Sequence, residues 1–332
     1  MDDEVITLAH GNGGARMRAL IEQVFATRLH MPDTENDAAP ICLPAGEAVV
    51  TTDGFTVQPL QFPGGDIGTL AVHGTINDLA VSGATPLYLT LAAFIEEGFP
   101  LAQLEALVES MGQAAHAAGL RVVAGDTKVL PRGTGGGVYF ALTGIGVRAH
   151  HYRLGLNRVR PGDKILVSGP VGDHGIAVML AREEFGLRGD VHSDAASVLP
   201  LTRALLPRHG LRFMRDATRG GLATVAHEIA HGAKLAVSLE EAAIPVREST
   251  QSVCAMLGYD PLYLACEGRV VAVLAPEAAR TGLQAWRALP QGAEAAIIGE
   301  IGNAPGPVTL RTPLGGQRLL PELEDDPLPR IC

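Results

Sequence analysis

The most regular hydrophobic pattern of the chain lies in the segment PLAQLEALVESMGQAAHAAGL. Leu104, Leu107 and Met111 recur at spacings of three and four residues, so they fall on one face of a helix. Pro100 stands where a helix can begin, and Gly119 stands where it can end. We therefore predict an amphipathic helix over this segment.

Shorter stretches rich in β-branched residues predict strands. Apolar residues that follow a glycine turn predict a second helix between the first two of these strands. The alternation of strands and helices indicates an α/β (α+β) fold. The predicted strands are residues 47–54, 121–129, 137–147 and 164–169, and the apolar segment with its helix is residues 63–86.

A polar, arginine-rich segment, RAHHYRLGLNRVRPGDK, predicts a hinge near residue 150. A chain of 332 residues is long enough for about two domains. We expect a flexible, glycine-rich N-terminal lid (residues 1–40), an N-terminal domain (41–150), a C-terminal α/β domain (151–320) and a mobile tail (321–332).

Composition narrows the function classes. Hydrophobic residues make up 47% and charged residues 19%, as in a globular protein, and the net charge of −10 argues against a nucleic-acid partner. No apolar run reaches transmembrane length, and the acidic start lacks a signal-peptide pattern. The cysteines lie far apart without a CxxC pair, which indicates free thiols in a reducing cytoplasm. They are Cys42, Cys254, Cys266 and Cys332.

The chain ends in EDDPLPRIC, with a thiol on the last residue, Cys332. Pro327 and Pro329 favour an extended segment without helix. A prenylation signal would place the cysteine fourth from the end, where Pro329 stands. The sequence therefore offers two interpretations of the tail, a frayed terminus or an arm that carries a nucleophile.

Three carboxylates stand in similar surroundings. Asp53 and Asp126 are expected at strand ends, and Asp78 lies inside an apolar helix, where an unpaired carboxylate is costly to bury. Brought together, three such groups suit Mg²⁺, which prefers oxygen ligands and substrate phosphates. Alone, Asp53 could be a turn residue and Asp126 a cap, so the prediction of a metal–phosphate site depends on all three carboxylates together.

Other phosphate-site motifs are absent, because no lysine completes a GxxxxGK[ST] loop and no GxGxxG is present. One of the three lysines, Lys128, follows Asp126 by two residues, so it could bind a phosphate or transfer a proton. Glu267 precedes a predicted buried strand, from which it could point into a cleft or remain a solvated loop charge.

The segment VAHEIAHG matches the HExxH pattern of zinc peptidases through His227, Glu228 and His231. These residues lie opposite the apolar stripe of their helix, as a solvated face does, and Lys234 occupies a position where the longer metzincin motif needs glycine. A zinc peptidase is kept as a remote alternative.

The motifs taken together resemble the HypE family of hydrogenase maturation proteins, over nearly the whole chain. They are LAHGNGG, TTDGFTVQPLQFPGGDIGTL, GTINDLAVSGATP, AGDTKV, GDHG, RDATRGG, ACEG and the terminal PRIC. HypE belongs to the superfamily of aminoimidazole ribonucleotide synthetase, selenophosphate synthetase and thiamine-monophosphate kinase. The resemblance implies a homodimer that pairs its N-terminal sheets, a larger C-terminal α/β domain, and ATP with Mg²⁺ as cofactors.

It also implies a role for the tail. In the family, the carbamoyltransferase HypF loads a carbamoyl group onto the terminal thiol, and HypE uses ATP to dehydrate it to a thiocyanate. The cyano group then passes to iron on the HypC–HypD complex, for a [NiFe]-hydrogenase. The alternative within the superfamily is a small-molecule kinase or synthetase in which Cys332 is idle.

Carried onto this sequence, the resemblance implies a set of site residues. Asp53, Asp78 and Asp126 would hold the metal, and Lys128 and Glu267 would polarise the substrate and remove its protons, with the division between them open. His10 would lie close to the reacting end. The expected catalytic residues are Cys332, Lys128, Glu267 and His10; the expected cofactor-binding residues are Gly11, Gly13, Gly14, Asp53, Gly65, Asp66, Asn77, Asp78, Asp126, Thr127 and Asp216.

Overall fold

The structure is a computed structural model that describes residues 4–31, 34, 36–182, 186–187, 189–324 and 331–332. The chain forms two compact units. The N-terminal unit comprises Met1–Leu79, Ala84–Ala149 and Cys332, and the C-terminal unit comprises Ala80–Gly83 and His150–Ile331. The expected tail, residues 321–332, falls partly outside the described residues, which omit 325–330.

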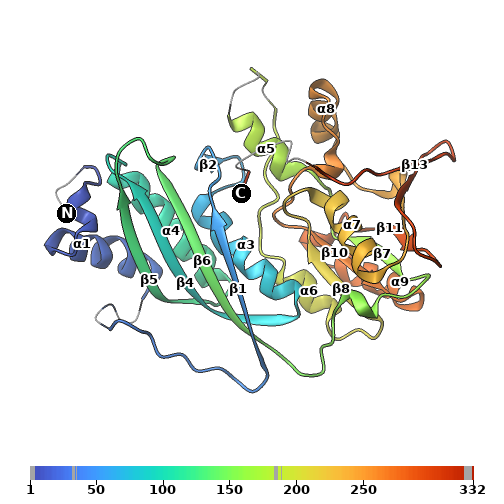
Figure 1. The fold of residues 1–332 in the computed structure, drawn as a ribbon, viewed down its shortest axis with the longest axis horizontal. Helices are drawn as coiled ribbons and strands as arrows, with labels where there is room; N and C mark the ends of the chain where they lie inside the picture. The colour runs from blue at the N-terminus through green and yellow to red at the C-terminus, as the bar shows by residue number, and fades with distance from the viewer. Residues whose placement is uncertain (1–3, 32–33, 35, 183–185, 188, 325–330) are drawn as a thin grey trace. The chain divides into compact units, whose positions relative to one another are not determined.

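The N-terminal unit has a four-stranded sheet with helices on one face (Figure 1), and a separate two-stranded sheet of β2 and β3. Its four-stranded sheet has the order β1-β6-β4-β5, in which β4 and β5 are parallel and the other pairs antiparallel. Its elements are η1 (Leu8–Gly11), α1 (Ala15–Leu20), the π-helix η2 (Ile21–Ala26), α2 (Thr27–Leu29), β1 (Glu47–Phe55), β2 (Gln61–Phe62), β3 (Gly65–Asp66), α3 (Ile67–Val81), β4 (Ala84–Glu96), α4 (Leu101–Ala117), β5 (Arg121–Leu130) and β6 (Val138–Arg148).

The pairing register shows which side chains face α3. Thr51 of β1 stands opposite Gly144 of β6, and a Cβ on Gly144 would lie 2.8 Å from Thr75 and 3.0 Å from Leu79 of α3. Because successive strand residues alternate between faces, Thr51 and Asp53 face α3, whereas Val50 and Thr52 face away. Val50 is 62% exposed on that uncovered face.

Several predicted elements are confirmed. The helix predicted from the regular pattern is α4, with Pro100 at its N-cap position, and Gly119 just beyond it has a φ of +75°. The strands predicted at residues 47–54, 121–129 and 137–147 are β1, β5 and β6. The sequence analysis missed β4, because its apolar run follows the apolar helix α3 without a polar alternation that would mark a half-buried strand.

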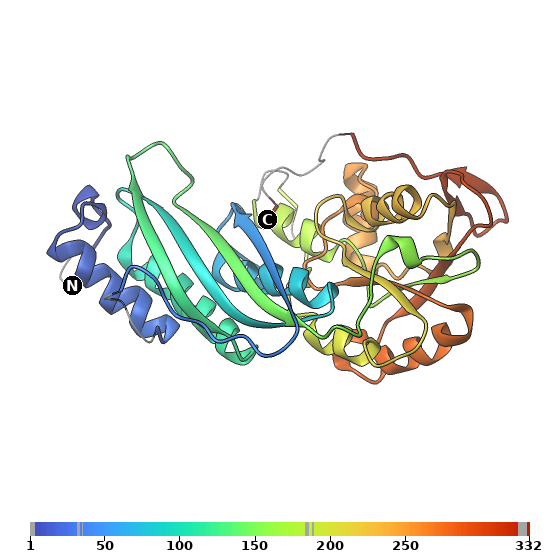
Figure 2. The same cartoon turned by 60° about the horizontal axis from the view of Figure 1, so that its bottom comes forward.

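The described part of the expected lid is largely helical. The segment from α1 to α2 packs beside α4, where a Cβ on Gly112 would lie 2.1 Å from the carbonyl oxygen of Arg28. Figure 2 shows this segment as a further helix next to α4. The N-terminal region is therefore a packed part of its unit from Leu8 to Leu29.

The C-terminal unit contains a seven-stranded sheet of the order β13-β12-β9-β11-β7-β10-β8. The strand predicted at residues 164–169 is confirmed as β7. The elements are η3 (Leu156–Arg158), β7 (Lys164–Val167), α5 (Asp173–Ala181), α6 (Leu199–Leu205), β8 (Leu211–Asp216), α7 (Gly221–Ala233), β9 (Val237–Glu240), η4 (Glu241–Ala243), α8 (Glu248–Leu257), η5 (Pro261–Tyr263), β10 (Val270–Leu274), α9 (Pro276–Arg287), η6 (Pro290–Gly292), β11 (Ala296–Ile301), β12 (Val308–Arg311) and β13 (Gln317–Leu319).

Both faces are covered at the middle of this sheet, so the central strands β7 and β10 are largely apolar. Strand β10 is buried along its whole length. Ile165 and Val271 belong to the core that includes the apolar face of α7, whereas Leu166 and Leu274 meet Gly282 of α9 on the other side. Among the described residues, no helix has the length and apolar character needed to cross a lipid bilayer.

Candidate functional site

Two of the predicted metal ligands, Asp53 and Asp78, lie on facing surfaces of β1 and α3. The Asp78 carboxylate accepts a 2.7 Å hydrogen bond from the hydroxyl of Thr51, two residues before Asp53 on the same face of β1. Asp53 also lies close to Gly74, which is one helical turn before Asp78 on α3. A Cβ placed on Gly74 would lie 3.9 Å from Oδ2 of Asp53. The structure therefore brings these two carboxylates to one surface, where they offer the oxygen ligands that a hard cation prefers.

Asp126 is placed differently from the expectation. It lies in the middle of β5, not at a strand end, and β5 and β1 are opposite edges of the sheet. Three strand spacings amount to about 14 Å. Asp126 is paired with Ala92 rather than with the α3-facing Leu91, so its side chain leaves the other face. Within this unit the strand order therefore separates Asp126 from Asp53 and Asp78, which the sequence alone did not show.

Lys128 lies beside Asp126, as its sequence position indicated. Its ammonium group is 2.9 Å from Asp126 Oδ2, and both side chains are more than half exposed, at 59% and 56%. The hydrogen bond from Lys128 lowers the pKa of the Asp126 carboxyl, and the backbone N–H of Thr127 contributes to the same effect. The pair therefore presents a fixed cation and a fixed anion on an open surface.

The predicted nucleotide loop reaches the same strand. A Cβ on Gly11 would lie 3.0 Å from Cβ of Val129, which follows Lys128. His10 is fully buried, and its Nδ1 accepts a 3.0 Å hydrogen bond from the Thr7 backbone. Gly13 has a φ of +77° and open space around it. His10 thus holds the turn η1 together, and the glycines beyond it leave room for a ligand near β5.

The other expected nucleotide residues are spread over the unit. Asp66 Oδ1 accepts hydrogen bonds from the Thr69 backbone at 2.8 Å and from the Ser110 hydroxyl at 2.8 Å, so Asp66 caps α3 and ties it to α4. Asn77 and Thr127 are buried. A Cβ placed on Gly65 would lie 3.0 Å from the hydroxyl oxygen of Thr69.

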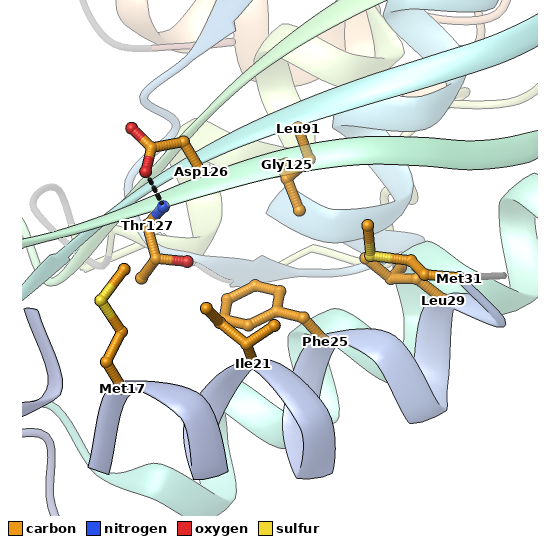
Figure 3. A pocket seen from close by; sticks show the side chains of 9 residues that line it. All are labelled: Met17, Ile21, Phe25, Leu29, Met31, Leu91, Gly125, Asp126 and Thr127. Carbon is orange, nitrogen blue, oxygen red and sulfur yellow. Dashed lines mark hydrogen bonds between the residues drawn. The ribbon is translucent and has the colours of Figure 1, made fainter. Parts of the chain in front are cut away.

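A cavity of about 120 Å³ separates the N-terminal helices from β4 and β5 (Figure 3). Apolar side chains of the N-terminal helices form one side of the cavity. The Thr127 side chain turns toward these helices, whereas the Asp126 side chain turns away from them. The lining residues are Met17, Ile21, Phe25, Leu29, Met31, Leu91, Gly125, Asp126 and Thr127. The cavity therefore lies on the face of β5 opposite the Lys128–Asp126 pair.

The last residue of the chain is held by the N-terminal unit. The backbone N–H of Thr56 donates to the carbonyl oxygen of Cys332 at 3.0 Å, and the Thr56 hydroxyl donates to the same oxygen at 3.1 Å. Thr56 directly follows β1, the strand that carries Asp53. The terminal thiol therefore belongs to the unit that carries the paired carboxylates.

Two of the other cysteines, Cys254 and Cys266, are buried. Burial raises the pKa of the Cys254 thiol to about 11 and that of Cys266 well above its ordinary value. Cys42 is exposed, and Cys332 is half-buried. Because thiolates are the nucleophilic form, Cys254 and Cys266 are structural residues.

In the C-terminal unit, Glu267 and Asp216 lie on adjoining segments. The backbone N–H of Cys266 donates to the carbonyl oxygen of Ala217 at 2.9 Å. Glu267 follows Cys266 and Asp216 precedes Ala217, so the two acidic residues flank this hydrogen bond. Both are buried, Glu267 at 2% exposure and Asp216 at 5%. Glu267 therefore does not behave as the solvated loop charge that the sequence left open.

The Glu267 loop is fixed by a residue that the sequence analysis missed, Asp194. Its carboxylate accepts the backbone N–H groups of Glu267 at 3.1 Å and Gly268 at 3.3 Å. It also lies 3.2 Å from the guanidinium of Arg269. Asp194 lies in a segment without regular structure, so no periodicity singled it out.

A second missed residue is His174, within the GDHG motif. It is fully buried, with Nδ1 2.8 Å from the Ser193 hydroxyl and Nε2 2.8 Å from the carbonyl oxygen of Ile331. Burial lowers its pKa. The motif itself was the available signal, but only the structure shows what the ring contacts.

On the HExxH helix, α7, His231 is exposed, and His227 and Glu228 are partly buried. Glu228, which would be the general base of a peptidase, is paired with Arg215 at 3.3 Å. His227 Nε2 is 3.0 Å from the carbonyl of Leu320. His231 lies 3.8 Å from Glu322, and these three side chains place one ligand atom each within 4.8 Å of one another. The geometry does not favour the peptidase, because its base is engaged elsewhere.

Comparisons with known proteins agree with this architecture. The family described as AIR synthase related protein matches with its N-terminal domain over residues 35–148 and its C-terminal domain over residues 160–310. Carbamoyl dehydratase HypE of Azotobacter vinelandii is 46% identical over 331 residues, which is 98% of this chain and 97% of that protein.

Solved structures give the same result. A crystal structure of the hydrogenase maturation protein HypE in complex with ATP superposes with a TM-score of 0.93 at 43% identity, covering 98% of this chain and 99% of that one. A crystal structure of a HypE–HypF complex contains a chain with a TM-score of 0.80 at 41% identity, covering 93% and 100%.

The two-unit fold and the matches to both family domains thus define an AIR synthase-related protein. Within that class, the identity over almost the full length is decisive: the chain belongs to the carbamoyl dehydratase HypE family.

Proposed function

We propose that this protein dehydrates an S-carbamoyl group on its own Cys332 to a thiocyanate, at the expense of ATP. The observation that carries the proposal is the double hydrogen bond from Thr56 to the Cys332 carbonyl. It fixes the last residue of the chain in the unit that carries Asp53 and Asp78. A frayed terminus would have no reason to be bound there, through backbone and side chain together.

The chemistry requires an activated oxygen. In S–C(=O)–NH₂ the oxygen is a poor leaving group, so phosphoryl transfer from ATP to that oxygen gives an O-phosphorylated intermediate and ADP. Loss of phosphate, with removal of both N–H protons, leaves S–C≡N. The balance is S-carbamoyl cysteine and ATP on one side, and thiocyanate, ADP, phosphate and a proton on the other. Phosphoryl transfer needs positioning and charge stabilisation, and the elimination needs a base.

Asp53 and Asp78 fit the binding of Mg²⁺ with the ATP phosphates, because both are carboxylates on one surface of the N-terminal unit. Bound there, the ion would neutralise phosphate charge. We propose a separate role for Asp126, which orients Lys128 through their 2.9 Å ion pair. We also propose that the glycine loop, Gly11 to Gly14, takes part in nucleotide binding, and that Asp216 adds a contact from the C-terminal unit.

Lys128 and Glu267 are the proposed groups for polarising the substrate and removing its protons. The ammonium of Lys128 can neutralise developing charge, as a point charge on a flexible stem. Glu267 is buried and held by its backbone to Asp194, so its position is defined. A fixed buried carboxylate is the better candidate for the base, since a base must be held within reach of the proton that it removes.

The partners follow from the family. We propose a cytoplasmic homodimer, whose interface includes the uncovered face of the N-terminal sheet on which Val50 is exposed. We propose HypF as the carbamoyl donor, by analogy with the relative whose complex with HypF has been solved. The HypC–HypD iron complex is the proposed acceptor of the cyano group, for the cyanide ligands of a [NiFe]-hydrogenase.

Intact-mass measurement tests the proposal. Protein carbamoylated by HypF should lose the mass of one water on addition of Mg–ATP, and Cys332→Ala should accept no carbamoyl group while still binding ATP. Cys42→Ser is the matched control, since it removes an exposed thiol elsewhere. A small-molecule kinase with an idle tail would keep full activity in Cys332→Ala, and that result would overturn the proposal.

A further inference from the structure

The ring of His174 is engaged at both nitrogens. It stands at the start of α5, and it has no exposed surface. Nε2 lies 2.8 Å from the carbonyl oxygen of Ile331, the residue before the terminal cysteine, and Nδ1 lies 2.8 Å from the hydroxyl of Ser193. Ile331 itself is 3% exposed.

These contacts define the protonation of the ring. A carbonyl oxygen can only accept, so Nε2 must carry the proton that is shared with Ile331. Burial lowers the pKa of His174, so the ring is neutral near pH 7 and its Nδ1 has the lone pair. Ser193 must then donate its hydroxyl proton to Nδ1, while its oxygen accepts the backbone N–H of Ala195 at 3.0 Å. The chain Ala195–Ser193–His174–Ile331 runs in one donor direction.

The direction of these hydrogen bonds, all donated toward Ile331, favours a role for His174 in holding the C-terminal tail. Ser193 selects the tautomer that points an N–H at the tail, as a second group commonly does for functional histidines. A buried N–H is costly to leave without an acceptor, so the position of Ile331 is favoured as long as the ring stays in place. Because His174 contacts the backbone carbonyl of Ile331, it restrains the polypeptide backbone one residue before the Cys332 thiol.

We propose that His174, oriented by Ser193, forms the binding site for the backbone carbonyl of Ile331 and so positions Cys332, the next residue, for dehydration. The inference rests on the proposed function for its catalytic consequence, but the binding itself does not. His174 is a positioning residue, since it contacts the tail backbone and not the reacting atoms.

The test uses the full-length protein with Cys42→Ser, so that Cys332 is the thiol open to alkylation, since Cys254 and Cys266 are buried. His174→Phe removes the donor and keeps a ring. We expect Cys332 to react with iodoacetamide about 5- to 10-fold faster, as the loss of one hydrogen bond in a buried site predicts. We expect carbamoylation by HypF to be unchanged and single-turnover dehydration at saturating ATP to slow by a similar factor.

Further variants separate positioning from a general structural effect. His174→Gln can restore an amide N–H toward Ile331, so it should recover most of the dehydration rate. Ser193→Ala should have a smaller effect in the same direction as His174→Phe. His227→Phe is the matched control, because it removes another histidine whose Nε2 contacts a carbonyl, that of Leu320, and it should change neither rate.

The readouts also separate this inference from the proposed function. Alkylation needs no dehydratase activity, so faster alkylation in His174→Phe alone supports the binding site even if Cys332 proves not to be the substrate. An alkylation rate that stays the same in His174→Phe overturns the inference, and so does a His174→Gln variant that behaves like His174→Phe. A Cys332→Ala protein with full activity would overturn the proposed function and leave the alkylation result standing.

Discussion

The carbonyl oxygen of Cys332 accepts hydrogen bonds from both the backbone N–H and the hydroxyl of Thr56, at 3.0 and 3.1 Å. The two residues are 276 positions apart in the sequence. Thr56 therefore binds the terminal residue through its backbone carbonyl and not through its side chain. This arrangement suits a residue whose side chain must carry a substrate.

The first prediction concerns that contact. Thr56→Ala removes the hydroxyl donor and keeps the N–H, so dehydration of carbamoylated protein should slow about 2- to 10-fold, the value of one hydrogen bond. ATP affinity should be unchanged. Thr52→Ala is the control on β1, the strand that precedes Thr56, because its hydroxyl donates to the carbonyl of Leu142 and not to the chain end. Single-turnover kinetics measure the dehydration rate of both variants. Equal rates in Thr56→Ala and Thr52→Ala would argue against a role for the contact between Thr56 and Cys332.

The second prediction separates the carboxylates. Asp53→Asn and Asp78→Asn should reduce Mg–ATP turnover by more than about 100-fold and raise the Mg²⁺ concentration needed for half-maximal rate, because each removes a charged ligand. Asp126→Asn should slow turnover without changing that concentration, since it lies on the opposite edge strand. Asp190→Asn, at a side chain that is 95% exposed, is the control. An equal Mg²⁺ dependence in all four variants would contradict the assignment.

The third prediction concerns Lys128. Its pair with Asp126 is largely exposed, so Lys128→Ala should change the melting temperature by less than about 2 °C. The dehydration rate should fall by more than about 100-fold if the ammonium stabilises charge in the transition state. Lys164→Ala breaks a comparable pair with Glu300 in the C-terminal unit and serves as control. A large loss of stability in Lys128→Ala would assign the residue to the fold.

The fourth prediction concerns the base. Glu267→Gln keeps the shape of the buried side chain, so the protein should fold and bind ATP within about 3-fold of the original affinity, while the rate at saturating ATP falls by more than about 100-fold. Glu300→Gln is the control. Should ATP affinity fall while the saturated rate stays normal, Glu267 is a ligand of the nucleotide and not the base.

The fifth prediction concerns acid stability. Burial lowers the pKa of His73 in α3 from 6.5 to about 4, so between these values the unfolded chain binds a proton that the folded chain does not. Stability should therefore fall as the pH drops below 6.5, with His73 accounting for about 1–2 kcal/mol by pH 5. His174, whose pKa is also lowered, contributes with the same sign.

His73→Leu should remove its share of this pH dependence. Denaturant unfolding at pH 7, 6 and 5 measures the difference between the original protein and the variant, so the contribution of His174 cancels. His209→Leu, at an exposed ring, is the control and should leave the pH dependence unchanged. If His73→Leu has the same slope as the original protein, the ring is not held neutral by burial.

The sequence by itself determined the elements whose pattern depends on near neighbours. The helix α4 followed from apolar positions three and four residues apart, and β1 and β5 followed from runs of β-branched residues. The family followed from short motifs such as GDHG and the terminal cysteine. Strand β4 escaped because a buried strand and a buried helix have the same continuous apolar character.

The tertiary structure decided which of these residues meet. Asp53 and Asp126 look equivalent in the sequence, but the strand order β1-β6-β4-β5 puts them on opposite edges, and the two-residue alternation puts them on opposite faces. Thr56 and His174 gained their roles from contacts with the chain end. The physical reason is that local propensity is fixed by residues a few positions away, whereas strand order and tail binding depend on packing between segments that are remote in the chain.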